Sequence, residues 1–335
     1  MSNAIVNVTR GNIVESKHNV SIVVANSSGE IIASAGDENL ITYMRSAAKP
    51  LQALNVILSK AYEKYNFTDE QLAIMCASHY GEEMHRKVIS EILEKIECTK
   101  NDLLCGSPLS ISEDYMKEQL LNHHKIDQLN SDCSGKHSGF LSVCKTKGYP
   151  IETYNQPDHP MQKEVLQVIS SMCDIKPENI FIGTDGCGVP VHGMPIKNMS
   201  IGYAKLATPD KLDENYKFAC NKIFDAMNAH PEMIAGTNGF CTELIKNTNG
   251  RLCGKLGAEG IYCIGIKDKD MGITFKVEDG NFRALYPAVM STLIQLDLLR
   301  DSEIKSLDRF VKPVIYSNTK LPIGNIIADF KLNFK

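Results

Sequence analysis

Ser46-Ala47-Ala48-Lys49-Pro50, followed by an apolar run, marks where the first helix of this chain begins. Leu54 and Leu58 in that run recur at helical spacing. Proline is tolerated only in the first turn of a helix, where the backbone N–H groups have no partner. The helix is therefore expected to start close to Ser46. Residues three apart share a helix face, so the Ser46 hydroxyl and the Lys49 amine can meet at its N-terminus.

The pattern Ser-x-x-Lys occurs four times in the chain, so its spacing alone decides nothing. The copies at Ser142/Lys145, Ser302/Lys305 and Ser317/Lys320 lack the helix start that follows Ser46. The field at a helix N-terminus disfavours a protonated lysine, and desolvation there eases loss of the proton. The context predicts a Ser46 nucleophile with a neutral Lys49 as its base. The alternative reading is a helix-cap serine beside an exposed lysine.

Composition favours a globular protein that acts on small molecules. The 335 residues carry a formal net charge of −4, with charges of both signs dispersed along the chain. This gives no basic field for nucleic acid or an acidic membrane surface. No signal segment opens the chain and no apolar run is long enough to cross a bilayer, so a cytoplasmic location is expected. The eleven cysteines lack the regular spacing of a secreted disulfide scaffold and are expected to be reduced thiols.

The order of elements predicts an α+β protein whose antiparallel sheet is built from both chain ends. An early hairpin, Val20–Ala25 with Glu30–Ala35, is followed by a mainly helical stretch. Short strands between about Thr242 and Val277 and a helix at Arg283–Leu299 come last. We expect one unit over residues 1–335, with helices packed on the sheet. Within it, 1–60 and 238–335 form the sheet layer, and 61–237 form a helical subdomain with the candidate metal loops.

Serine β-lactamases and penicillin-binding proteins share this order of elements and carry Ser-x-x-Lys on the first helix and Lys-Thr-Gly on a late strand. Lys255-Leu256-Gly257 is the corresponding late segment, expected on the second strand of a meander. A lysine on an edge strand is more often a solvated charge. The third element is ambiguous, because Ser131-Asp132-Cys133 resembles Ser-Asp-Asn, whereas Ser78 also lies in a loop of small residues after a helix.

Five ordered motifs together resemble those of the rhizobial-type (class 3) L-asparaginases, the asparaginase II family. They are Arg45-Ser46-Ala47-Ala48-Lys49-Pro50, Ala77-Ser78-His79-Tyr80-Gly81-Glu82, Asp132-Cys133-Ser134-Gly135-Lys136-His137-Ser138-Gly139, Asp185-Gly186-Cys187-Gly188-Val189-Pro190 and Lys255-Leu256-Gly257-Ala258-Glu259-Gly260. The resemblance implies a fold related to serine β-lactamases and glutaminases, usually as a homodimer. It also implies hydrolysis of L-asparagine to L-aspartate and ammonia.

The resemblance further assigns roles to individual residues. The two Ser–Lys tandems of the family match Ser46 with Lys49 and Ser78 with Lys255, so Ser78 is favoured over Ser131. The family's zinc site matches Cys133, Lys136 and Cys187, and a water would complete the coordination. Arg45, His137 and Asp185 match positions that line the substrate site. The implied chemistry is attack by Ser46 on the side-chain amide to give an acyl-enzyme, which water then releases.

Other readings of these motifs stay open at this point. Cys133 could act as the nucleophile with His137 as its base, because an imidazole activates a thiol in many hydrolases. A non-catalytic amino-acid or metal-binding protein could use the same scaffold, since a shared fold does not guarantee turnover. A penicillin-interacting hydrolase is a third possibility, and the expected cytoplasmic location counts against it.

Overall fold

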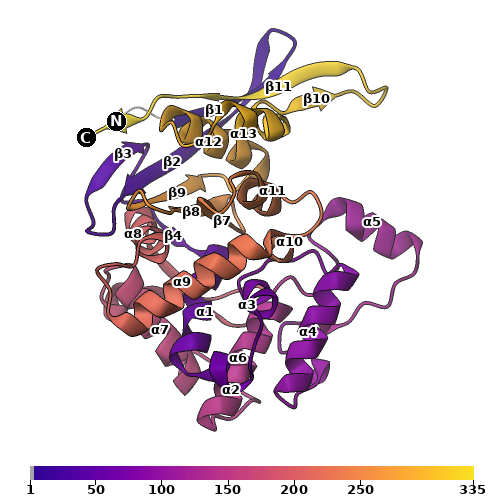
Figure 1. Cartoon of the computed structure of the whole chain (residues 1–335). Coiled ribbons are helices and arrows are strands. Elements are labelled where there is room, and N and C mark those ends of the chain that lie inside the picture. The colour runs from indigo at the N-terminus through magenta and orange to yellow at the C-terminus, as the bar shows by residue number, and fades with distance from the viewer. Residues whose placement is uncertain (1–3) are drawn as a thin grey trace. The chain divides into compact units, whose positions relative to one another are not determined.

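The computed structural model describes residues 4–335, and the chain divides into two compact units. Unit 1 holds the described residues up to Ala47, then Met194–Thr208 and Glu243–Lys335. Unit 2 holds Ala48–Gly193 and Pro209–Thr242. Figure 1 follows the chain through both, from the indigo N-terminal strands to the yellow C-terminal strands.

Unit 1 is built on one antiparallel sheet that draws strands from both ends of the chain (Figure 1). Along the sheet the strands run in the order β10 (Val314–Tyr316), β11 (Pro322–Asp329), β1 (Ala4–Arg10), β2 (Ile13–Ala25), β9 (Met271–Val277), β8 (Ile261–Ile266) and β7 (Leu252–Gly257). Next to β2 lies β3 (Ile31–Ala35), which also pairs with β12 (Asn333–Phe334). The predicted α+β class, with an antiparallel sheet assembled from both chain ends, is confirmed.

Helices cover the centre of this sheet. Every residue of β8 is buried, as expected for a strand whose two faces are both covered. Two helices, α8 (Ile196–Ala207) and α12 (Phe282–Gln295), pack on β9 and β8. Gly272 lets α8 approach closely, because a Cβ there would collide with the Ser200 carbonyl oxygen. The sequence reading missed α8, whose continuous burial leaves no polar face to mark a helical period.

Unit 2 is mainly helical, with α1 (Lys49–Leu58) packed against α6, α7 and α9. The other helices are α2 (Ala61–Lys64), α3 (Asp69–Met75), α4 (Glu83–Lys95), α5 (Glu113–Leu121), α6 (Ser134–Lys147), α7 (Pro160–Met172), α9 (Glu214–Ala229) and α10 (Pro231–Ile234). A hairpin of β5 (Phe181–Thr184) and β6 (Pro190–Pro195) completes it, with the end of β6 belonging to unit 1. The start of α3 is fixed by a capping box between Thr68 and Gln71.

Three expected local structures need correction. Helix α6 begins at Ser134, so Cys133, expected in one of the candidate metal loops, is the N-cap residue of a helix. The segment from Thr242 is helical, because α11 spans Phe240–Asn247 and has a buried apolar side. Lys255 lies on β7, which is the first strand of the β7–β8–β9 meander and not the second.

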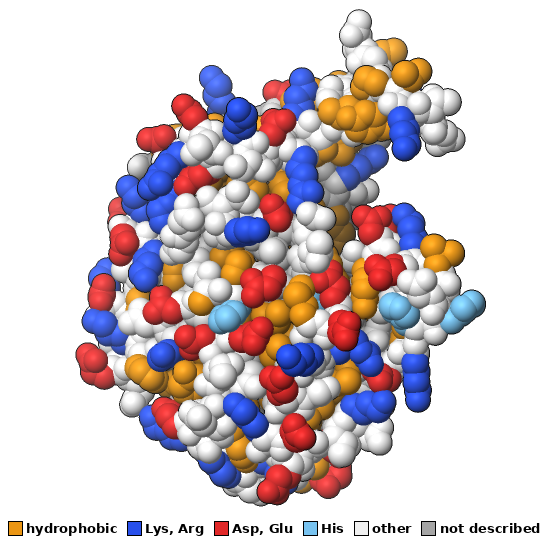
Figure 2. All heavy atoms as spheres, turned by 45° about the vertical axis from the view of Figure 1, so that its right-hand side comes forward, with side chains coloured by type: hydrophobic (Ala, Val, Ile, Leu, Met, Phe, Trp, Pro, Cys, Tyr) orange, Lys and Arg blue, Asp and Glu red, His pale blue; other side chains and the backbone are white. Residues whose placement is uncertain are grey.

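The face drawn in Figure 2 shows no large field of one sign. Acidic and basic side chains are intermingled over the face drawn in Figure 2. Within residues 4–335, none of the helices has both the length and the apolar character needed to cross a bilayer.

Candidate active site

Lys49 is the charged centre of a buried cluster in unit 2. Its side chain is 1% exposed at the start of α1. The Nζ atom donates to Ser78 Oγ at 3.0 Å and to the Asp132 carbonyl oxygen at 3.0 Å, and lies 3.2 Å from Asp132 Oδ2. A hydroxyl and an amine from different segments are thus in hydrogen-bond contact, as proton transfer between them requires.

The charge on Lys49 differs from the sequence prediction. Burial opposes the charged amine, but Asp132 and then Cys133 outweigh that effect and raise the pKa of Lys49. The same ion pair overcomes the burial of Asp132 and lowers the pKa of that carboxyl. The predicted neutral Lys49 is therefore wrong for the resting protein, because the prediction considered the helix N-terminus and not a carboxylate brought in by the fold.

Backbone hydrogen bonds hold Ser78 in its place after α3. The Ser78 N–H donates to the Ile234 carbonyl at 3.0 Å, and the Tyr80 N–H donates to that of Ala235 at 2.7 Å. His79, wholly buried, accepts from the Gly81 N–H at Nδ1 and therefore donates from Nε2 to Ser134 Oγ, 3.0 Å away. The Ser78 loop is thereby tied to the first turn of α6.

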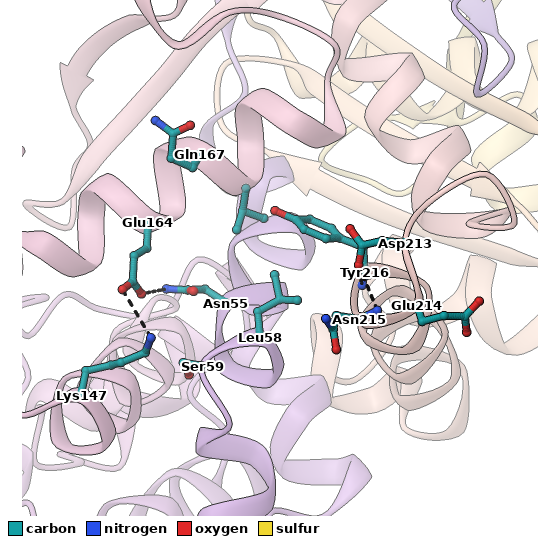
Figure 3. Close-up of a pocket in the computed structure, with 11 residues that line it drawn as sticks. Asn55, Leu58, Ser59, Lys147, Glu164, Gln167, Asp213, Glu214, Asn215 and Tyr216 are labelled. Atoms are coloured by element: carbon teal, nitrogen blue, oxygen red, sulfur yellow. Dashed lines mark hydrogen bonds and ion pairs between the residues drawn. The ribbon is translucent and has the colours of Figure 1, made fainter.

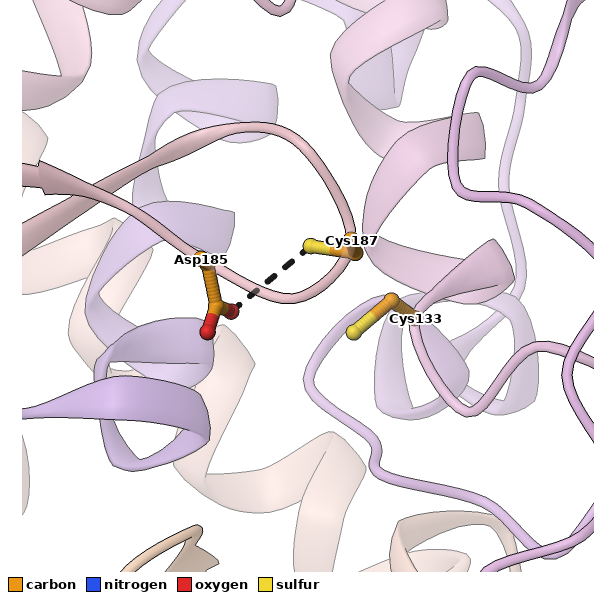
Figure 4. Close-up of side chains that lie close together, drawn as sticks. All are labelled: Cys133, Asp185 and Cys187. Atoms are coloured by element: carbon orange, nitrogen blue, oxygen red, sulfur yellow. Dashed lines mark hydrogen bonds between the residues drawn. The ribbon is translucent and has the colours of Figure 1, made fainter.

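A second buried cluster in unit 2 brings together the predicted metal ligands. The Sγ atoms of Cys133 and Cys187 and a carboxylate oxygen of Asp185 all lie within 4.8 Å of one another. Lys136 Nζ donates to Cys187 Sγ at 2.9 Å and is 4.0 Å from Asp185 Oδ2. Figure 4 shows Asp185 and Cys187 on one turn, with Cys133 facing them from the start of the neighbouring segment.

The two thiols affect each other's pKa. Hydrogen bonding between them lowers the pKa of Cys187 far below the usual range and raises the pKa of Cys133. Burial disfavours an ammonium at Lys136, but its neighbours Cys133, Cys187 and Asp185 raise its pKa. The surroundings therefore favour an anionic Cys187 beside a charged Lys136.

The donor set fits zinc. Two cysteine sulfurs and a carboxylate are ligand types that Zn²⁺ takes, and four-coordinate sites built on two cysteines are common. Metal binding to a cysteine displaces the thiol proton. The neighbours of Lys136 raise its pKa, so coordination by its amine requires loss of a proton. Asp185, which the sequence analysis assigned to the substrate site, offers a carboxylate oxygen as a third donor.

His137 and Tyr154 border this cluster. The Tyr154 hydroxyl lies 2.6 Å from His137 Nδ1, and the two rings meet edge to face. Burial lowers the pKa of His137, so the ring is neutral. The sequence reading missed Tyr154, because a single tyrosine 17 residues away carries no local signal. It considered the aspartate beside Cys133 only as a partner of a metal ligand and did not predict its contact with Lys49.

The remaining predicted site residues, Arg45, Ser46 and Lys255, belong to unit 1. Arg45 and Ser46 lie in a short 3-10 helix, Arg45–Ala48, where Arg45 has a positive φ of 50°. Lys255 is fully buried on β7 and donates to the Leu256 carbonyl at 2.7 Å. The predicted tandems each pair one residue of unit 1 with one of unit 2, and they stay predictions.

Glycine at position 257 lets β7 reach the segment that carries Ser46. A Cβ on Gly257 would lie 2.7 Å from the Met44 carbonyl oxygen and 3.2 Å from the Ala47 nitrogen. The Ala47 carbonyl in turn accepts from the Tyr203 hydroxyl at 2.7 Å. The glycine of Lys255-Leu256-Gly257 thus has a packing reason within unit 1.

A cavity of about 510 Å³ in unit 2 does not coincide with these clusters. Figure 3 shows it bordered by Glu164, which lies 3.7 Å from Lys147 Nζ and accepts from Asn55 at 3.4 Å. None of the predicted site residues is among those that line it. The candidate site therefore consists of the two buried clusters around Lys49 and around Cys187.

A family of known proteins matches nearly the whole chain. The family described as L-asparaginase II matches residues 6–328. No match was found among curated proteins. A crystal structure of Mglu in its native form shows 14% identity and a TM-score of 0.39, over 85% of this chain and 67% of the other. Simvastatin synthase (LovD) from Aspergillus terreus, as the LovD6 mutant, shows 12% identity and a TM-score of 0.38, over 77% of this chain and 86% of the other.

Proposed function

The chain belongs to the L-asparaginase II family, and we propose that it hydrolyses L-asparagine to L-aspartate and ammonia. The observation that carries this proposal is the buried contact of Lys49 Nζ with Ser78 Oγ beside Asp132. Amide hydrolysis needs an activated nucleophile and an acid that protonates the departing nitrogen. A buried amine in contact with a hydroxyl can serve both needs.

In the proposed reaction, Ser46 Oγ bonds to the side-chain amide carbon and the C–N bond breaks. The departing nitrogen takes up a proton and leaves as ammonia, and water then cleaves the ester to release aspartate. Lys49 is charged at rest, so it must release a proton before it can accept one from Ser46. Ser78 Oγ, 3.0 Å away, is the hydroxyl that relays this proton. Lys255, the sequence partner of Ser78, is the proposed second amine of the relay.

Substrate binding is proposed to involve Arg45, His137 and Asp185. A guanidinium group can bind the carboxylate of a free amino acid, and a carboxylate can bind its ammonium group. Arg45 and Asp185 therefore provide partners for the two charged groups of the substrate. We propose that Cys133, Lys136 and Cys187 hold Zn²⁺, with Asp185 as a further donor. The ion, when bound, supplies a fixed positive charge beside the substrate.

The alternative nucleophile, Cys133 with His137 as base, is less well supported. Hydrogen bonding to Cys187 raises the pKa of Cys133, which keeps this thiol protonated. His137 Nδ1 is already engaged by Tyr154. Turnover that survives in Ser46→Ala but is lost in Cys133→Ser would reverse this ranking.

The test is coupled detection of ammonia from L-asparagine, with L-glutamine as the comparison substrate. We expect Ser46→Ala, Lys49→Ala, Ser78→Ala and Lys255→Ala each to lower kcat by about 10³-fold or more, as for groups that act as a unit. Ser302→Ala and Lys305→Ala are matched controls, because they alter an exposed copy of the same Ser-x-x-Lys pattern. Parent rates in Ser46→Ala and Lys49→Ala would refute the mechanism. No ammonia from the parent would favour a binding protein.

The family resemblance also makes a cytoplasmic homodimer part of the proposal. Light scattering on the purified chain measures the mass in solution, and fractionation of the source cells locates the protein. A monomer would contradict the proposed homodimer, and protein found outside the cytoplasm would contradict the proposed location. Neither result would bear on the proposed reaction.

A further inference from the structure

A third cluster in unit 2, the His230 cluster, consists of Glu70, His230 and Glu232 and shares no residue with the two clusters described above. One nitrogen of His230 and one carboxylate oxygen of each glutamate all lie within 4.8 Å of one another. The closest measured pair is His230 Nδ1 and Glu232 Oε1, at 3.5 Å. The three side chains are half-buried, so an ion from solvent can reach them.

The two carboxylates of the His230 cluster have no basic partner. Within residues 4–335, neither Glu70 nor Glu232 forms an ion pair with a lysine or an arginine. Two carboxylates held this close disfavour each other's charge. One divalent cation between them would neutralise both charges at once.

The ligand types and their spacing fit a transition-metal ion. The imidazole separates this cluster from a purely acidic patch, because imidazole nitrogen is the commonest protein ligand of such metals. Nitrogen and oxygen ligands of Zn²⁺ lie at about 2.0–2.2 Å, which puts two tetrahedral ligands about 3.4 Å apart. The 3.5 Å between His230 Nδ1 and Glu232 Oε1 matches this spacing. It exceeds the roughly 2.7–3.2 Å of an N–H···O hydrogen bond.

Packed elements hold the three ligands in place. Glu70 lies in the first turn of α3, whose start is fixed by its capping box. Glu232 lies on α10, which packs on α3 and buries Met233. The Glu232 carbonyl oxygen also accepts a hydrogen bond from His85 Nε2 at 3.1 Å. Ligands carried by such elements keep their mutual geometry better than ligands on loops.

We propose that Glu70, His230 and Glu232 bind one divalent transition-metal ion with the ligand preferences of Zn²⁺, and that this ion joins α3 to α10. The consequence reaches the segment after α3. Ile234 is the last residue of α10, and its carbonyl accepts from the Ser78 N–H at 3.0 Å. An ion in the His230 cluster therefore stabilises the backbone contact that holds Ser78.

Calorimetric titration of the full chain with Zn²⁺ tests the site. We expect the parent to bind one equivalent more than Glu70→Gln and His230→Asn. The His230 side chain makes no capping hydrogen bond to α10, so His230→Asn leaves that helix end intact. His123→Asn is the matched control, because His123 is an exposed histidine of unit 2 outside the cluster, with a positive φ of 51° that asparagine tolerates. Equal zinc binding by the parent and both cluster variants overturns the proposal.

The site is independent of the proposed asparaginase activity and of the cysteine cluster. An equivalent of zinc that is lost in Cys133→Ser and kept in His230→Asn belongs to the cysteine cluster, and the reverse pattern belongs to the His230 cluster. Hydrogen exchange at the Ser78 amide, measured by NMR, tests the link between α3 and α10. With free Zn²⁺ at about 100 times its Kd, exchange through openings that break the site slows by about 100-fold in the parent. The same exchange rate with and without zinc overturns this link.

Discussion

Lys49 Nζ donates a hydrogen bond to Ser78 Oγ across 29 positions of sequence, at 3.0 Å and out of contact with solvent. The sequence motifs pair Lys49 with Ser46 and Ser78 with Lys255. The structure places Lys49 of one predicted tandem in contact with Ser78 of the other. A proton can therefore move between members of different tandems without a bridging water.

This link predicts that Lys49 and Ser78 act as a unit. We expect Lys49→Met, Ser78→Ala and the double variant to lower kcat/KM for L-asparagine by similar factors, because removing either member disables the same relay. Steady-state kinetics on the four proteins of the cycle measures the coupling. Independent roles would instead make the losses of the single variants multiply in the double variant.

Zinc content should depend on both thiols. We expect the parent, purified without added metal and then supplemented, to retain zinc on elemental analysis, and Cys133→Ser and Cys187→Ser to lose it, since hydroxyls are poor zinc ligands. Cys220→Ser is the control, because Cys220 is buried on α9 outside the cluster. A parent protein that takes up no zinc after supplementation would refute the metal site.

We expect the charge of Asp127 to make the free energy of unfolding depend on pH. Although burial opposes its charge, hydrogen bonds from Arg86 and Lys100, both at 2.8 Å, lower the pKa of Asp127. A lowered folded-state pKa contributes stability above the unfolded value of about 3.9, and this contribution is lost as the pH falls towards the folded value. We expect Asp127→Asn to lower the free energy of unfolding by about 2 kcal/mol at pH 7.

Urea unfolding followed by circular dichroism, from pH 7 down to pH 3.5, measures the Asp127 effect. The gap between parent and variant should narrow below about pH 4, because Asp127 of the unfolded chain then takes up a proton while the folded carboxyl stays charged. Asp114→Asn is the control, because its pair with Lys117 is solvent-exposed at 3.8 Å and is expected to contribute less than about 1 kcal/mol. A gap that stays constant over this range would show that the charge of Asp127 is not responsible.

Gly257→Ala should disturb both stability and turnover. The added methyl meets Ile261 and the Met44 carbonyl oxygen, and backbone atoms cannot move aside cheaply. We expect a loss of about 1–3 kcal/mol in unfolding free energy, with a fall in kcat because the Ser46 segment must shift. Gly186→Ala, where the new methyl enters open space, should leave stability within about 0.5 kcal/mol. Equal stability of the two variants would contradict the packing argument.

Local signals in the sequence were enough to predict where several elements begin. The Thr68–Gln71 capping box sets the start of α3, because both of its hydrogen bonds lie within four residues. Pro50 marks the first turn of α1 for an equally local reason, its missing N–H. By contrast α8, buried all round, offered no periodic contrast between polar and apolar faces.

The sequence by itself determined the family, the antiparallel sheet drawn from both chain ends, and the types of residue available for chemistry. Only the tertiary structure decided their charge and partners. Asp132 holds Lys49 as an ammonium from 83 positions away, and Tyr154 orients His137 through its hydroxyl. The physical reason is that pKa and tautomer follow from groups within a few ångströms in space. Those neighbours are set by packing between segments that no local pattern connects.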